Sequence, residues 1–134
     1  MPSPATPAWI KPLFLVAALY DGLLGLAFLT VPLRIYAWMN VPPPNHPGYI
    51  QFPAAMLIIF GYAFWLVARD PVRRRDLIWL GCMLKIAYCA VVFAHAASAG
   101  GIPTIWTIFA VADLLFLFAF IAALRTLAPH APAA

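Results

Sequence analysis

The stretch LIWLGCMLKIAYCAVVFAHAA, residues 77–97, decides the fold of this chain. It is apolar except for isolated residues such as Lys85 and His95. As an α-helix it rises about 1.5 Å per residue, so it is long enough to cross a hydrocarbon core of roughly 30 Å. The stretch therefore predicts a membrane-spanning helix.

Three further apolar runs occur at about residues 13–31, 52–68 and 105–124. Hydrophobic residues make up 66% of the chain and charged residues 9%, whereas a soluble domain needs far more polar side chains to cover its surface. The runs lack the alternation typical of membrane β-barrel strands. We therefore predict an all-α integral membrane protein with four transmembrane helices in a compact bundle.

The 134 residues provide room for one domain, and we expect its transmembrane part to occupy residues 13–124. Residues 1–12 combine four prolines with Trp9 and Lys11, which is typical of a flexible tail followed by an interface anchor. Residues 125–134 form the expected C-terminal tail. The first apolar run is too long for the apolar core of a signal peptide, so we expect it to remain as a span.

Basic residues predict the orientation. With four spans, the termini and the loop of residues 69–76 share one side of the membrane, and six basic residues fall there against Arg34 alone on the other side. Because basic residues favour the cytoplasm, we expect both termini to be cytoplasmic, in the inner membrane of a bacterium. The six residues are Lys11, Arg69, Arg73, Arg74, Arg75 and Arg125.

The arginine cluster next to the spans also bears on partners. Arg69, Arg73, Arg74 and Arg75 lie between two apolar runs, where we expect them to contact lipid headgroups. These four arginines contribute much of the net charge of +4. Because they lie beside membrane spans, we do not expect the basic charge to bind nucleic acid. The expected partners are the lipid bilayer and, beyond it, other membrane subunits or further copies of the chain.

Three ionisable residues lie deep within the predicted spans: Asp21, Lys85 and Asp113. At 1.5 Å per residue, each is about 12–15 Å from a membrane surface, so all three fall near the same level. Each would cost roughly 2.5–3.5 kcal/mol at the bilayer centre if left facing lipid. We therefore expect a buried ionic cluster, which could also bind a proton, a cation or an amine because it has two acids and one base.

A polar stripe supports this cluster. Gly81, Lys85, Tyr88, Val92 and His95 recur at spacings of 4, 3, 4 and 3, which places them on one face of a helix. His95 could relay protons to Lys85 through Tyr88. The alternative is that His95 hydrogen-bonds a carbonyl group at the membrane interface.

Small residues and thiols have structural interpretations. Gly22 and Gly25 flank Asp21 and could allow close approach of a neighbouring backbone. Cys82 and Cys89 are seven residues apart, about 10 Å along a helix, too far for a disulfide or for gripping one metal ion unaided. No catalytic residue and no metal site is predicted, and the cofactor remains unknown.

Seven aromatic residues on the second and fourth spans surround their helices. We expect packing and lipid-facing surface there first, and a pigment or quinone pocket second. They are Phe60, Tyr62, Phe64, Trp65, Phe116, Phe118 and Phe120.

The chain is similar in size to small multidrug-resistance transporters and shares an acid in the first span, Asp21. That family carries a Glu in a different motif, and this chain has no Glu. Vitamin K epoxide reductase-like proteins require a Cys-x-x-Cys pair, which the sequence lacks. A general resemblance to bacterial four-span proteins implies no activity.

Three functions follow, in order of preference. The first is a non-enzymatic accessory or self-associating membrane component, fastened internally by the cluster. The second is a proton- or cation-coupled small-molecule transporter that uses Asp21, Lys85 and Asp113. The third is a membrane enzyme acting on a lipid or quinone. A fastening role requires a dry cluster, whereas a transporter requires a path to the acids.

Overall fold

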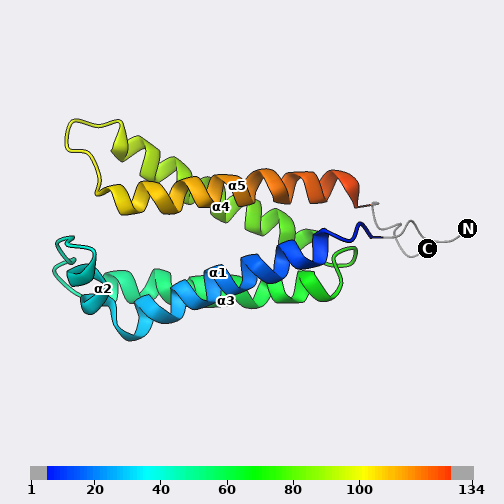
Figure 1. The fold of residues 1–134 in the computed structure, drawn as a ribbon, viewed down its shortest axis with the longest axis horizontal. Helices are drawn as coiled ribbons and strands as arrows, with labels where there is room; N and C mark the ends of the chain where they lie inside the picture. The colour runs from blue at the N-terminus through cyan, green and yellow to red at the C-terminus, as the bar shows by residue number, and fades with distance from the viewer. Residues whose placement is uncertain (1–5, 128–134) are drawn as a thin grey trace, which may run out of the picture.

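The computed structural model describes residues 6–127, and this part of the chain contains helices and turns but no strand (Figure 1). Four long helices are each long and apolar enough to span a membrane, which confirms the predicted four-span, all-α integral membrane protein. A short additional helix was not expected. The helices are α1 (Ile10–Thr30), α2 (Pro32–Trp38), α3 (Gly48–Arg69), α4 (Arg75–Ala96) and α5 (Thr104–Thr126).

The helices extend beyond the predicted spans. α1 begins at Ile10, within the segment expected to be tail and anchor, and α3 begins at Gly48, so that Pro53 lies inside it rather than in its first turn. α5 continues to Thr126. Residues 128–134 of the expected C-terminal tail lie outside the described residues.

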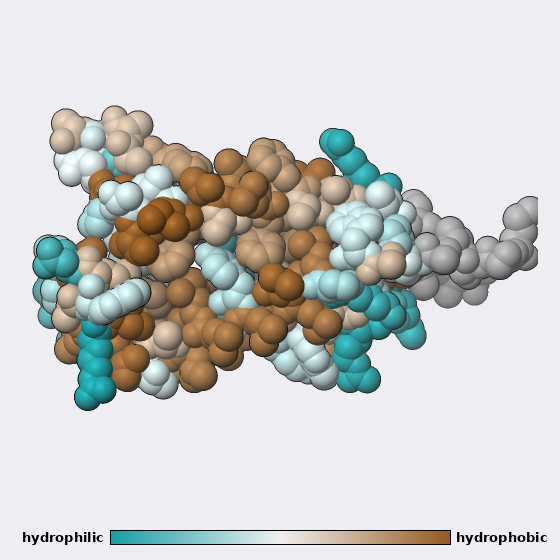
Figure 2. Space-filling model, viewed as in Figure 1, coloured by the Kyte–Doolittle hydropathy of each residue, from teal (hydrophilic) through white to brown (hydrophobic). Residues whose placement is uncertain are grey.

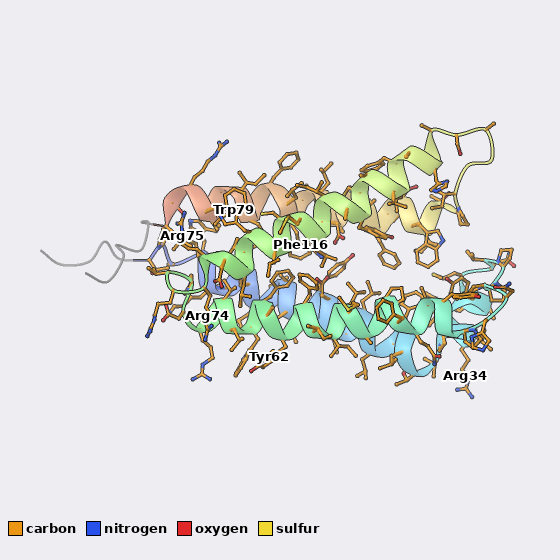
Figure 3. All side chains as sticks on the ribbon, turned by 180° about the vertical axis from the view of Figure 1, so that it is seen from behind. Arg34, Tyr62, Arg74, Arg75, Trp79 and Phe116 are labelled. Atoms are coloured by element: carbon orange, nitrogen blue, oxygen red, sulfur yellow. The ribbon has the colours of Figure 1, made fainter. Side chains whose placement is uncertain are left out.

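The bundle consists of two helix pairs, α1 with α3 and α4 with α5 (Figure 1). The pairs converge at the end where α1 begins, α5 ends and the α3–α4 loop lies. They diverge toward the end that holds α2 and the α4–α5 turn, and the view from behind shows the same divergence (Figure 3). The two pairs therefore share their largest core at the convergent end, and at the other end Trp106 of α5 packs against Phe28 and Tyr36.

Glycines allow α1 and α3 to pack backbone against backbone. A Cβ placed at Gly25 would lie 2.5 Å from the Ala54 carbonyl oxygen, and one placed at Gly61 would lie 2.9 Å from the Gly22 nitrogen. Real Cβ atoms cannot approach backbone so closely. Gly25 therefore does what the sequence predicted for it, and Gly61 makes the reciprocal approach from α3.

The shared core at the convergent end is aromatic. The rings of Phe14 and Phe120 stack with centroids 4.7 Å apart, and Phe64 meets Phe120 edge-on at 5.1 Å. Gly81 on α4 makes room for them, because a Cβ there would lie 2.5 Å from the Phe64 ring. Residues from all four long helices are buried in this core, and its Gly81 lies one helical turn from Lys85 on α4.

α2 folds the start of the long connection back against the bundle. Pro32 occupies its first turn, and Asn40 ends it in the left-handed region with φ 54°. The amides of Asn40 and Val41 bond the carbonyls of Ala37 and Tyr36, the pattern of a Schellman motif. The helix stops because its last carbonyl groups are satisfied by this turn.

Tyr36 on α2 turns inward, unlike the other two large aromatic residues near this connection. It is 7% exposed and packs against Phe28, whereas Trp38 and Tyr49 are exposed. Burial raises the pKa of the Tyr36 phenol above its ordinary value. The short helix therefore delivers one aromatic ring to the interior and leaves the others on the surface.

The surface carries an apolar band with polar groups at both ends (Figure 2). Large exposed hydrophobic side chains occur on all four long helices, as expected of helices that face lipid. Arg34 lies at one end of the molecule, and Arg74 and Arg75 lie at the other (Figure 3). The structure thus separates the basic residues between two ends as the sequence pattern predicted.

Candidate functional site

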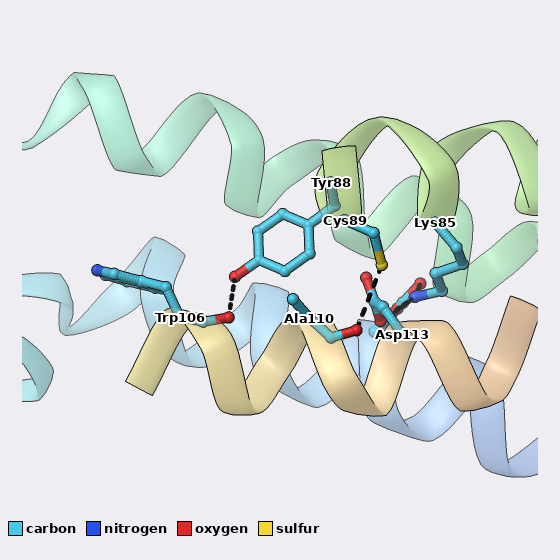
Figure 4. A network of polar contacts seen from close by, with 7 residues as sticks. Lys85, Tyr88, Cys89, Trp106, Ala110 and Asp113 are labelled. Carbon is cyan, nitrogen blue, oxygen red and sulfur yellow. Dashed lines mark hydrogen bonds and ion pairs between the residues drawn. The ribbon is translucent and has the colours of Figure 1, made fainter. Parts of the chain in front are cut away.

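Lys85 joins the two helix pairs. Its Nζ on α4 donates hydrogen bonds to Asp21 Oδ1 and Oδ2 on α1, at 2.8 and 3.0 Å. The same Nζ lies 2.9 Å from Asp113 Oδ1 on α5. The predicted buried Asp–Lys–Asp cluster is therefore confirmed (Figure 4).

The cluster is dry. Asp21 and Lys85 are each 1% exposed and Asp113 is 7% exposed. An unpaired charge at such a site would cost several kcal/mol. The pairing is thus the condition under which these residues can occupy the middle of the bundle.

The two acids are not equivalent. Asp21 accepts hydrogen bonds on both oxygens, but Asp113 Oδ1 accepts none within the described part of the chain, despite its short distance to Lys85 Nζ. The Lys85–Asp113 contact is therefore an ion pair without hydrogen-bond alignment. Asp21 is the principal partner of Lys85, and Asp113 keeps unused acceptor capacity.

Aromatic rings enclose the ammonium group. Lys85 Nζ lies 5.5 Å from the ring centres of Tyr20 and Phe116 and 5.9 Å from that of Phe64. The electron-rich faces of such rings attract cations. Phe64 and Phe116 were expected to form packing and lipid-facing surface, and Tyr20 was not among the expected site residues. The position of Tyr20 directly before Asp21 was a signal that it could lie near the cluster. Nothing in the sequence shows that its ring faces Lys85.

The remaining stripe residues take separate places. Tyr88 Oη donates to the Trp106 carbonyl at 3.3 Å, and Cys89 donates to the Ala110 carbonyl (Figure 4). Both contacts join α4 to α5. His95 is exposed near the end of α4, and the structure brings it together with neither Tyr88 nor Lys85.

The arginine cluster lies at the convergent end of the bundle. Arg69 stacks over Trp65 at 5.0 Å, and Arg73 pairs with Asp70 at 4.0 Å. Arg75 donates to the carbonyl of Leu127, which ties the start of α4 to the end of α5. Arg73 and Arg74 are exposed, so both guanidinium groups can reach a headgroup layer at this end.

A cavity of about 370 Å³ lies between the diverging helix pairs, next to the cluster. Asp21 and Asp113 are the charged residues that line it. The rest of its wall is mainly apolar or aromatic, with contributions from all four long helices. Its other lining residues include Tyr20, Phe28, Met56, Phe60, Tyr88 and Trp106.

Aromatic side chains close the far end of this cavity. Trp106 on α5 lies 6.0 Å from Phe28 and 5.8 Å from Tyr36 between ring centres, so it bridges the two helix pairs. Phe52 and Met56 line the cavity on α3 and are themselves exposed on the apolar surface. The cavity is therefore reached from the lipid-facing side.

The charges of the cluster and the shape of the cavity determine what the site can bind. Among residues 6–127, no three His, Cys, Asp or Glu side chains group closely enough to hold a metal ion. The cluster can hold charges together, bind a proton or bind a cation. Comparison of the chain with protein-family models, with curated proteins and with solved structures gives no match.

Proposed function

We propose that this protein is a non-enzymatic membrane component in which the Asp21–Lys85–Asp113 cluster fastens two helix pairs to each other. The observation that carries the proposal is that Lys85 contacts an acid from each pair while all three residues are almost completely buried. A dry, bridging cluster is what fastening requires. The exposed aromatics Tyr62 and Trp65 on α3 offer a surface for a second copy or a partner subunit.

The geometry explains why fastening is needed. The largest core shared by the two pairs lies at the convergent end, and the pairs diverge toward the other end, where Trp106 packs against Phe28 and Tyr36. Lipid provides no hydrophobic force that would press the pairs together, so specific contacts must do so. Lys85 lies one turn along α4 from Gly81 of the shared core, so its contacts with Asp21 and Asp113 add a second tie between the pairs.

Cutting the chain between the pairs tests this role. With a protease site placed in the 70–74 loop, the two halves should remain together after cleavage in mild detergent. The same cut in a Lys85→Met protein should release them, because the charged tie is lost. Lys11→Met, which removes an exposed lysine, should leave the halves together. Co-purification of the cleaved halves measures this, and halves that stay joined without Lys85 would refute fastening by the cluster.

We further propose that both termini face the cytoplasm, in the inner membrane of a bacterium. The start of α1, the end of α5 and the arginine-rich loop lie at one end of the molecule, and Arg34 lies at the other. This separation of basic residues supports the cytoplasmic side for the former.

Reporter fusions test the orientation. A reporter that requires the cytoplasm should be active after Ala134, whereas one that requires the periplasm should be active only when inserted after Asn45. Activity of the periplasmic reporter at the C-terminus would reverse the assignment.

A proton- or cation-coupled small-molecule transporter is the second candidate. The cavity that reaches both acids favours it. Uptake of a small molecule into vesicles that contain the parent protein or Asp113→Asn distinguishes the two candidates. A transporter should show uptake in the parent, and Asp113→Asn should leave it folded but inactive. The fastening role predicts no uptake in either protein.

A further inference from the structure

The cavity between the helix pairs has no part in fastening, yet it is built unlike a packing defect. Its volume is about 370 Å³, which lies in the range of small-molecule sites. Its wall is apolar almost throughout, and Asp21 and Asp113 line it while keeping their carboxylate oxygens nearly covered. An apolar chamber that borders two buried acids matches a ligand that has an apolar body and a positive head.

Charge supports a positive head in particular. Lys85 supplies one positive charge to two carboxylates, so the cluster carries one formal negative charge in excess. Asp21 uses both oxygens on Lys85, whereas Asp113 Oδ1 is buried and accepts no hydrogen bond from any described residue. A second ammonium group beside Asp113 would balance the charge without displacing Lys85.

The wall next to the acids is suited to an ammonium group as well. Tyr20 and Tyr88 line the cavity, and the faces of their rings can attract a cation. Further along, Phe28, Phe60 and Trp106 provide surface for a hydrocarbon body.

We infer that this cavity binds an amphiphilic ammonium compound, which enters from the lipid phase and places its charged nitrogen against Asp113 and its hydrocarbon part among the aromatic rings. A hydrated metal ion does not fit, because the wall beyond the acids offers few polar ligands. An anion would be repelled by the excess carboxylate. A neutral acyl chain would fill the wall but leave that charge unbalanced. The inference goes beyond the fastening role and does not depend on it.

Bromine quenching of Trp106 tests the proposal directly, because Trp106 lines the cavity. Trp9, Trp38, Trp65 and Trp79 are exposed, so replacing each with Phe leaves Trp106 as the single fluorophore. The protein is placed in nanodiscs of zwitterionic phosphatidylcholine and titrated with 8-bromooctylammonium or with neutral 8-bromooctanol. We expect saturable quenching by the ammonium probe, with half-saturation at least tenfold lower than for the alcohol.

Two variants assign the effect to the site. Asp113→Asn should remove the tenfold preference for the ammonium probe, because it removes the charge and keeps the shape. Leu57→Phe combined with Leu84→Phe narrows the cavity from both helix pairs and leaves the cluster intact, so it should weaken quenching by both probes. Leu115→Phe, at a lipid-facing position, should change nothing.

The outcomes separate the possible occupants. Equal half-saturation for both probes would overturn the proposal and identify a site for acyl chains. Quenching that rises linearly for both probes would also overturn it, because the cavity would then bind neither. If Asp113→Asn does not fold, the narrowed cavity still decides, since quenching unaffected by narrowing excludes the site. The cleavage experiment tests the fastening role separately. If it refuted fastening by the cluster, the quenching results would still decide whether the cavity binds the ammonium probe.

Discussion

Replacing Lys85 with Met should destabilise the protein by about 3–5 kcal/mol, the cost typical of removing one partner from a buried ion pair. Met keeps the length of the side chain, so the loss comes from the charge and its contacts rather than from a cavity. Without the ammonium group, Asp21 and Asp113 face each other in a dry site with no counter-charge. The measurement is the free energy of unfolding in mild detergent. Unfolding is induced by heat or by denaturant, and the loss of helix content reports it.

Removing an acid in addition should restore part of the loss. Lys85→Met with Asp21→Asn should recover more stability than Lys85→Met with Asp113→Asn, because Asp21 is the more deeply buried acid and loses two hydrogen bonds. The interaction energy from each double-mutant cycle gives the share of each acid.

Lys11→Met is the matched control, because Lys11 is the other lysine of the chain and is exposed. Its effect should stay within about 0.5 kcal/mol. A Lys85→Met protein as stable as the parent, with double variants equal to the sum of the single ones, would show that the three residues do not act as a cluster.

The fold was predictable because the sequence patterns that determine it extend over many residues. Four apolar runs and the depth of three charged residues within them are enough to give four spans and one ionic level. α2 was missed because a seven-residue helix beside three consecutive prolines leaves a weak periodic signal. Its end signals were present, however: Pro32 at a favoured first-turn position and Asn40 at the left-handed stop.

The only part of the site that could be predicted is the part that the free-energy cost of burying charge requires. The cost of burying charge predicts that Asp21, Lys85 and Asp113 meet, but it does not predict which acid takes the hydrogen bonds. Nor does it predict the ring of Tyr20 over Lys85 or the cavity. These depend on how far the helix pairs diverge, which is a property of packing between residues distant in the sequence.

Adding a single methyl group at Gly25 should separate α1 from α3. The added Cβ would lie 2.5 Å from the Ala54 carbonyl oxygen and 3.0 Å from the Ile58 nitrogen. Both are backbone atoms of α3, so no side chain can move aside, and the helices must part along their length. We expect Gly25→Ala to lower the free energy of unfolding by about 1–3 kcal/mol, the range for overpacking, with a larger loss for Gly25→Leu.

Gly22→Ala is the matched control, one turn away on the same helix. No described atom outside the neighbouring helix backbone lies within 4 Å of a Cβ placed there, so this variant should be neutral or slightly stabilising, since Ala favours helix over Gly. Asp21 lies one turn from Gly25, so parting the helices should also draw its carboxylate away from Lys85. Gly25→Ala combined with Lys85→Met should therefore cost less than the sum of the two changes. Strict additivity would show that the glycine contact and the ionic tie stabilise the bundle independently.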